Sequence, residues 1–224
     1  MPDTLTPEPP KRAGQARDPR GTQQGILDAA FIEFTDHGLS GARVDAIAAR
    51  TGTNVRMIYY YFGSKEGLFI AVLEEMYRRF NEAEAKLSLA DVPPLDALVA
   101  VIRFMWVHYQ KHPEFITLLN TENLHRGKHI SKSLRAAEYS SPAVSVLGEV
   151  LARGVRQKLF RDDVPARDVY LMIASMGYFY LSNRFTLSAF LGEQLETPEA
   201  LAHWESFVID AVMRTVRPAT SPAS

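Results

Sequence analysis

The residues with the most useful binding chemistry lie between Arg43 and Lys65. The guanidinium of Arg56 can bind the O6 and N7 atoms of one guanine together, and Val55 can contact a thymine methyl group. Tyrosine hydroxyls and the Lys65 ammonium suit phosphate oxygens, which fix the position of a protein on DNA without reading its sequence. Together these groups could read a major groove. The candidate DNA contacts are Thr22, Arg43, Thr53, Asn54, Val55, Arg56, Tyr59, Tyr60, Tyr61 and Lys65.

These side chains need a helix-turn-helix to present them. Apolar residues at helical spacing predict a first helix over Thr22–His37, which Gly38 ends. A short helix over Val44–Arg50 follows, then the turn Thr51-Gly52-Thr53, and Asn54 is expected to cap a third helix that ends at Phe62. Met57, Ile58 and Phe62 should face inward. Since three consecutive helical residues cannot share a face, we expect one of the three tyrosines to pack inward.

The charge of the chain is distributed unevenly. The net charge is −1, which by itself argues against a nucleic-acid partner. However, residues 11–20 contain four basic residues and one acid, as do residues 41–65, so each stretch is locally positive. The N-terminal arm, residues 1–20, is rich in proline and charge and is expected to be disordered. Its Arg17 and Arg20 either solubilise the chain or enter a minor groove.

The rest of the chain also has helical periodicity. A long helix is expected from Ser64 to about Leu89, with a boundary at Pro93-Pro94, and no convincing strand pattern follows. The fold class is therefore all-α, with a DNA-binding domain over 21–67, a larger helical domain over 68–217 and a disordered tail over 218–224. The further helices are expected over 95–111, 113–125, 141–159, 165–191 and 198–216.

Other chemistry has little support in the sequence. The chain has no cysteine, no GxSxG motif and no glycine-rich phosphate loop, so we predict neither an enzyme nor a cofactor. Glu122, His125 and His129 have a spacing that admits a metal site, but Gly127 disfavours a helix there, and exposed loop histidines are the preferred interpretation. The longest apolar stretch, Val169–Leu181, is too short to span a bilayer, and no secretion signal is expected. We expect a cytoplasmic protein without a membrane partner.

Four motifs together resemble the N-terminal domain of the TetR family of bacterial regulators. These motifs are ILDAA, VDAIAARTG, IYYYF and SKEGLF, all within Ile26–Glu74. The resemblance implies a homodimer that binds double-stranded DNA and is released from a palindromic operator by a small molecule. It also implies that the candidate DNA contacts, apart from Thr53, touch DNA. Many members have a lysine at the position of Val55 and a small residue at that of Arg56, so no operator sequence can be transferred.

The same resemblance implies a ligand pocket in the larger domain and a dimer interface made by the last two helices. The effector is expected to be partly apolar, either aromatic or lipid-like. Two alternatives remain open, namely an activator or corepressor-dependent regulator, and a helical ligand carrier or enzyme that retains the three-helix domain. The candidate pocket residues are Phe104, His108, Phe115, Leu119, Asn123, Tyr139, Met172 and Asn183.

Overall fold

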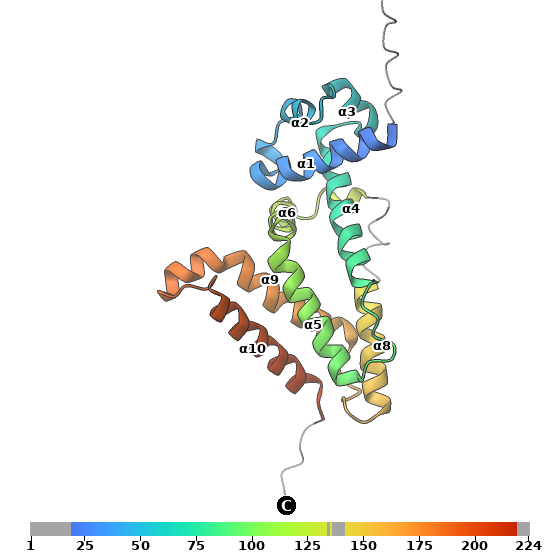
Figure 1. The fold of residues 1–224 in the computed structure, drawn as a ribbon, viewed down its shortest axis with the longest axis vertical. Coiled ribbons are helices and arrows are strands. Elements are labelled where there is room, and N and C mark those ends of the chain that lie inside the picture. Colours follow the sequence, from blue (N-terminus) through green and yellow to red (C-terminus); the bar gives the residue numbers. More distant parts are fainter. Residues whose placement is uncertain (1–18, 134, 136–141, 219–224) are drawn as a thin grey trace, which may run out of the picture.

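The chain was analysed as a computed structural model that describes residues 19–133, 135 and 142–218. All regular elements within these residues are helices, as the hydrophobic periodicity predicts. A small group of helices lies above a longer helical body (Figure 1). The elements are α1 (Pro19–Gly41), α2 (Val44–Thr51), α3 (Val55–Phe62), α4 (Lys65–Glu84), α5 (Pro94–Lys111), α6 (Pro113–Leu124), the 3₁₀ turn η1 (Ile130–Lys132), α8 (Pro142–Arg156), α9 (Ala166–Leu191) and α10 (Pro198–Val216).

The first three helices form the predicted helix-turn-helix domain, which we call the head. The chain kinks at Gly38, where φ is +64°, and α2 ends at Gly52, where φ is +61°. Both conformations suit glycine because a side chain makes positive φ unfavourable. The centre of the head is formed by three completely buried side chains, namely Ile26 and Phe34 of α1 and Ile47 of α2. The predicted bounds of α2 and α3 are confirmed to within one residue.

Helix α4 connects the head to the body. Ser64 caps its first turn, since the Ser64 hydroxyl accepts a hydrogen bond from the Gly67 N–H at 2.9 Å. The helix ends at Glu84, so the expectation that it reaches Leu89 is wrong. The guanidinium of Arg153 holds the segment that follows. It donates to the backbone carbonyls of Leu89, at 2.7 Å, and Val92, at 3.0 Å, and so satisfies carbonyls in a non-helical conformation.

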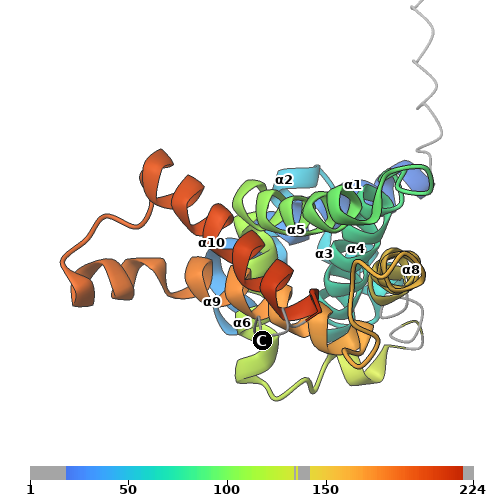
Figure 2. The same ribbon diagram turned by 90° about the horizontal axis from the view of Figure 1, so that it is seen from below.

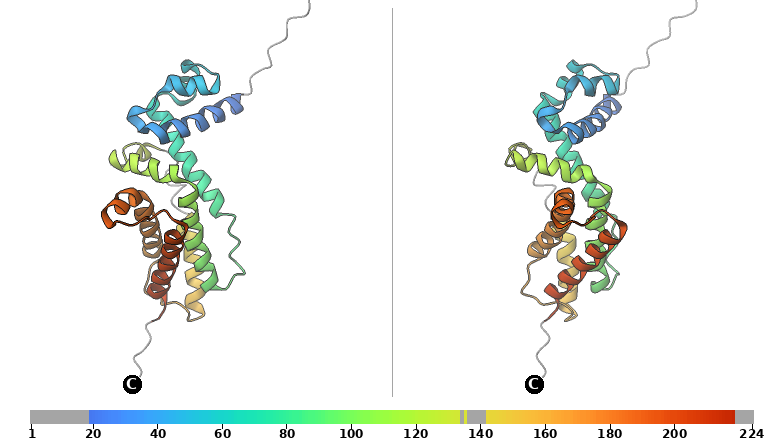
Figure 3. Two further views of the ribbon diagram at one scale, coloured as in Figure 1. Left: turned by 60° about the vertical axis from the view of Figure 1, so that its left-hand side comes forward. Right: turned by 90° about the vertical axis from the view of Figure 1, so that its left-hand side faces the viewer.

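The body packs α5 between α8, α9 and α10, while α6 crosses below α1 (Figures 1 and 3). Its buried core includes Leu98, Ile102 and Met105 of α5 and Leu147 of α8. Seen from below, α10 lies on the side of the body away from α8 (Figure 2). No helix in the described part of the chain combines the length and apolar character needed to cross a membrane.

Two glycines of α8 differ in the space around them, which gives a matched test of the packing. A Cβ at Gly154 would lie 1.9 Å from the Phe160 ring, whereas a Cβ at Gly148 would meet only Ala166, at 3.7 Å. Gly154→Ala should lower the free energy of unfolding by about 1–3 kcal/mol because Phe160 must move. Gly148→Ala should raise it by about 0.5–1 kcal/mol through helix propensity. Urea denaturation checks both, and equal effects of the two substitutions would contradict this packing.

Candidate nucleic-acid interface

The outer face of α3 presents the predicted base-reading side chains. The Asn54 side chain accepts a hydrogen bond from the Met57 N–H at 2.9 Å, which confirms the expected cap and fixes the start of the helix. Ile58 is completely buried and anchors the opposite face to the head. As a result Arg56 is exposed, and the side chains of Tyr59 and Tyr60 are 43% and 77% exposed. These three residues are available to an incoming duplex.

Two other candidates on α3 lie partly inside the head. Tyr61 and Val55 are half-buried and pack against the core, as does Phe62. The Tyr61 ring meets the Tyr60 ring edge-on, with 5.3 Å between the ring centroids. One of the three tyrosines therefore packs inward, as expected from helical geometry, and it is Tyr61. The burial of Val55 leaves Arg56 as the most accessible base reader on this helix.

The cations that flank α3 have partners within the head. The Lys65 ammonium lies 3.2 Å from the Ser40 carbonyl oxygen, which holds it at the junction of α1 and α4. The Arg43 guanidinium makes two hydrogen bonds to Asp45, at 3.1 and 2.7 Å, and these bonds lower the pKa of the exposed Asp45 carboxyl. To contact a phosphate, Arg43 would have to exchange its bonds with the Asp45 carboxylate for bonds with the phosphate. The partner of Lys65 is an uncharged carbonyl, so the positive charge of Lys65 is not neutralised.

A groove between α1 and the end of α2 brings together two predicted residues and one that sequence reasoning missed. Thr22 from the start of α1 and Thr53 from the turn line a groove of about 590 Å³, together with Arg50 at the end of α2. The hydroxyl oxygen of Thr53 is buried and has no hydrogen-bond partner within the described residues. From the sequence, Arg50 was counted only toward the local positive charge of residues 41–65 and was not predicted to contact DNA. Its position just before the glycine turn is the signal that could have assigned it to this surface.

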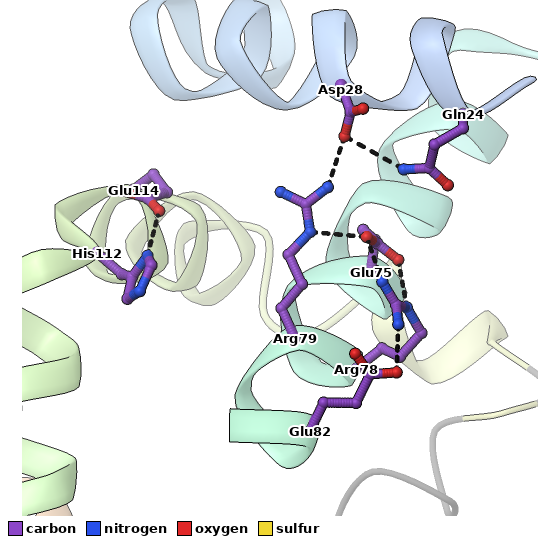
Figure 4. Close-up of polar contacts among 8 residues, drawn as sticks. All are labelled: Gln24, Asp28, Glu75, Arg78, Arg79, Glu82, His112 and Glu114. Atoms are coloured by element: carbon purple, nitrogen blue, oxygen red, sulfur yellow. Dashed lines mark hydrogen bonds and ion pairs between the residues drawn. The ribbon is translucent and has the colours of Figure 1, made fainter. Parts of the chain in front are cut away.

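A network of charged side chains fixes the head to α4. Arg79 on α4 donates to Asp28 on α1 at 2.5 Å and to the buried Glu75 at 2.7 Å (Figure 4). Arg78 donates to the same Glu75 at 2.6 Å and also pairs with Glu82. Burial alone would raise the pKa of Glu75, but the hydrogen bonds from Arg78 and Arg79 hold it below its usual range. The two guanidiniums therefore keep this carboxylate charged, and one of them reaches α1.

The residues that admitted a metal site serve the structure instead. The backbone N–H groups of His129 and Ile130 donate to one oxygen of Glu122, at 2.7 and 2.9 Å. The His129 Nδ1 atom lies 2.7 Å from the other oxygen. His129 is 1% exposed, so the expectation of an exposed loop histidine is wrong for this residue. No group of three metal-binding side chains occurs within the described residues.

Two family models match most of the chain. The model for bacterial regulatory proteins of the tetR family matches residues 26–72, and the model for the tetracyclin repressor-like C-terminal domain matches residues 94–212. The HTH-type transcriptional repressor NicS of Pseudomonas putida is 46% identical over 207 residues, which are 92% of this chain and 98% of that protein. The chain belongs to the TetR family. It is a transcriptional regulator whose helix-turn-helix binds DNA.

Two further transcriptional regulators extend the comparison. The HTH-type transcriptional repressor SCO4008 of Streptomyces coelicolor is 32% identical over 72% of this chain and 79% of its own length. The solved structure of the transcriptional regulator FadR from Bacillus subtilis, in complex with stearoyl-CoA, is 18% identical and superposes with a TM-score of 0.65. That match covers 85% of this chain and 97% of FadR, and it shows a common fold.

The residues predicted to line a ligand pocket in this TetR-family chain do not all lie together. Phe104, His108 and Phe115 surround the Phe80 ring, with centroid distances of 4.8 to 5.5 Å. His108 and Phe115 also line a cavity of about 100 Å³. Burial and the neighbouring His112 lower the pKa of His108 to about 4, so its ring is neutral near pH 7.

The other predicted pocket residues have different positions. Leu119 and Met172 are half-buried against the core. The Asn123 and Asn183 side chains donate to the carbonyls of Leu119 and Phe179 in their own helices, both at 2.9 Å. Tyr139 lies outside the described residues. The aromatic group around Phe80 therefore joins three members of the predicted set through contacts between side-chain rings.

Arg56→Ala tests the base-reading role. The substitution should reduce discrimination between operator and random DNA by about 1–3 kcal/mol, because a bidentate contact to guanine is lost. Competition binding measures this difference, with an operator selected from a random DNA library by the wild-type protein. Lys111→Ala, which removes an exposed charge at the end of α5, is the control. Unchanged affinity of the Arg56 variant for both kinds of DNA would contradict the assignment.

Lys65→Ala tests the phosphate contact. It should weaken binding to all DNA sequences and reduce the slope of log affinity against log salt concentration by about 1, since one counterion fewer is released. A titration at several salt concentrations gives the slope, with Lys86→Ala as the control in an exposed site of the body. Equal slopes for wild type and the Lys65 variant would exclude the contact.

Proposed function

We propose that this protein is a dimeric repressor that a small molecule releases from a palindromic operator. The observation that carries the proposal is the outward face of α3, where Arg56, Tyr59 and Tyr60 stand exposed on a helix fixed by Ile58. NicS, which is named a transcriptional repressor, matches almost the whole chain and supports repression rather than activation. We infer neither enzymatic activity nor a cofactor, and a protein that acts on the bacterial chromosome would work in the cytoplasm.

The apolar surface of the last two helices supports dimerisation. Large apolar side chains stand exposed along α9 and at one position of α10. An exposed patch of this kind marks an interaction surface in a water-soluble protein. A two-fold pair built on α9 and α10 would present two α3 helices to one duplex, and each would read one half-site. The exposed side chains are Leu171, Phe179, Phe185, Phe190, Leu191 and Phe207.

Helix α4 is the route by which an effector would act. We propose a head over residues 21–67 and a ligand-binding and dimerisation domain over 68–217, so that the boundary falls in the first turn of α4. A change at the body end of a rigid helix becomes a tilt at the head end, and the Asp28–Arg79 ion pair carries that tilt into α1. One state of the dimer would hold its two α3 helices too far apart to fit both half-sites. An effector that binds only this state lowers the affinity for the operator, because binding of effector and of DNA are thermodynamically linked.

The experiment that tests the function combines operator selection with a reporter. An operator selected in vitro should have two inverted half-sites about one helical turn, or a multiple of it, apart. Placed before a reporter gene, it should give higher expression without the regulator than with it. Lower expression without the regulator would instead indicate an activator. A selected site without inverted symmetry would argue against the dimeric mode of binding.

Phe179→Glu tests the dimer interface. A charge placed on this exposed apolar face should convert dimers to monomers and reduce operator affinity about 100-fold or more, because the second half-site no longer adds to binding. Light scattering after size exclusion gives the mass, and circular dichroism verifies the fold. Leu124→Glu is the matched control, since Leu124 is 83% exposed and belongs to the end of α6 rather than to α9 or α10. Dimers that survive the Phe179 substitution would exclude this interface.

A further inference from the structure

The buried carboxylate of Glu84 is the feature of the body that packing does not explain. Glu84 is the last residue of α4 and is 1% exposed. Neither of its oxygens has a hydrogen-bond partner within the described residues. A buried ionised group without a partner is unfavourable by several kcal/mol, and buried polar groups in proteins are normally hydrogen-bonded.

The other buried carboxylates that the structure describes all have partners. Glu33 accepts from the Arg43 N–H at 3.0 Å, Glu75 from two arginines, and Glu122 from the N–H groups of His129 and Ile130. Each of these three holds a turn or a helix in place. Glu84 makes no such contact, so a role in local structure does not account for its burial.

The position of Glu84 increases the cost of its charge. The C-terminal end of a helix carries a partial negative charge, which disfavours a carboxylate there. Burial raises the pKa of Glu84 to about 7, so near neutral pH the group is close to losing its charge. Among the described residues no cation offsets either effect. A bound cation would relieve both the desolvation of the carboxylate and its repulsion by the helix end.

Phenol groups from two other helices lie near this carboxylate. The charge of Glu84 contributes to raising the pKa of Tyr109 on α5 and of Tyr170 on α9, with burial as the larger cause. Tyr77 on α4 and Tyr178 on α9 also contribute to raising the pKa of Tyr109. The Glu84 carboxylate therefore lies close enough to aromatic side chains of α5 and α9 for the charges of these groups to interact. Aromatic faces attract cations, and phenol hydroxyls donate or accept hydrogen bonds.

We propose that Glu84 is the polar anchor of the effector site and that the effector is a nitrogen cation on an aromatic or otherwise apolar body. A protonated amine or protonated heterocyclic nitrogen would donate to the Glu84 carboxylate, while the surrounding tyrosine rings cover the apolar part. This inference rests on the proposed release of the repressor by a small molecule, and it names the chemical class of that molecule. Because Glu84 ends α4, the cation would act directly on the helix that leads to the head.

The test uses the full-length protein and three probes above pH 7, namely benzylammonium, tryptammonium and the uncharged benzyl alcohol. Calorimetric titration should detect saturable binding of at least one cation to wild type, in preference to the alcohol. Glu84→Gln, which keeps the shape and removes the charge, should weaken cation binding at least tenfold and leave alcohol binding unchanged. Glu82→Gln, an exposed neighbour on the same helix, should leave both unchanged.

Thermal unfolding without probes distinguishes a binding role from a structural one. If Glu84 is an uncompensated charge kept for binding, Glu84→Gln should have a higher Tm than wild type. Wild-type protein that binds neither cation, or that binds them no better than the alcohol, would overturn the proposal. Equal cation affinity in the Glu84 variant would also overturn it.

Operator binding separates this inference from the proposed function. Glu84→Gln should bind the selected operator as well as wild type does, since Glu84 lies in the body. If wild type binds a cation but the cation does not release the operator, the cation site stands and the release model fails. If no operator can be selected, the repressor function fails, whatever the calorimetry shows.

Discussion

The packing of the first half of α4 against α1 is the contact on which the remaining structure depends. Phe69 is completely buried and meets Phe34 of α1 edge-on, with 5.1 Å between ring centroids. On another side the same ring meets His129, at 5.4 Å, in the segment that follows α6. One α4 side chain thus contacts both the head and the body, and α3, which carries Arg56, packs against the same helix.

Charged groups at this junction follow one rule, which is that burial requires partners. Glu75 and Glu122 are buried and remain hydrogen-bonded, and each ties a different part of the chain to the region around α4. Removal of one partner from such a group would leave a buried polar atom unsatisfied, which costs more than the net value of the bond. The junction is therefore specific in geometry, and Glu84, at the far end of the same helix, stands out as the one exception among the buried carboxylates described.

Much of the head could be predicted from the sequence, because local signals determine it. Glycine at Gly52 and the Asn54 cap fix the ends of α2 and α3 within a few residues, and periodicity identifies the buried faces. The path of the chain after α4 could not be predicted in this way, since it is held by Arg153, a residue distant in the sequence. The burial of His129 depends in the same way on Glu122 and Phe69. Tertiary hydrogen bonds decided these cases, and no local pattern encodes them.

The pocket residues show the same limit more clearly. The family resemblance implied that Asn123 and Asn183 line a pocket in the larger domain, yet each bonds to a carbonyl of its own helix. No sequence signal marks Glu84 in this way. Only its burial in the folded chain, without a hydrogen-bond partner among the described residues, makes that carboxylate unusual. Helix α4 therefore has paired carboxylates at Glu75 and Glu82 and an unpaired buried carboxylate at its last residue, and a cation bound there would act on the helix that leads to the head.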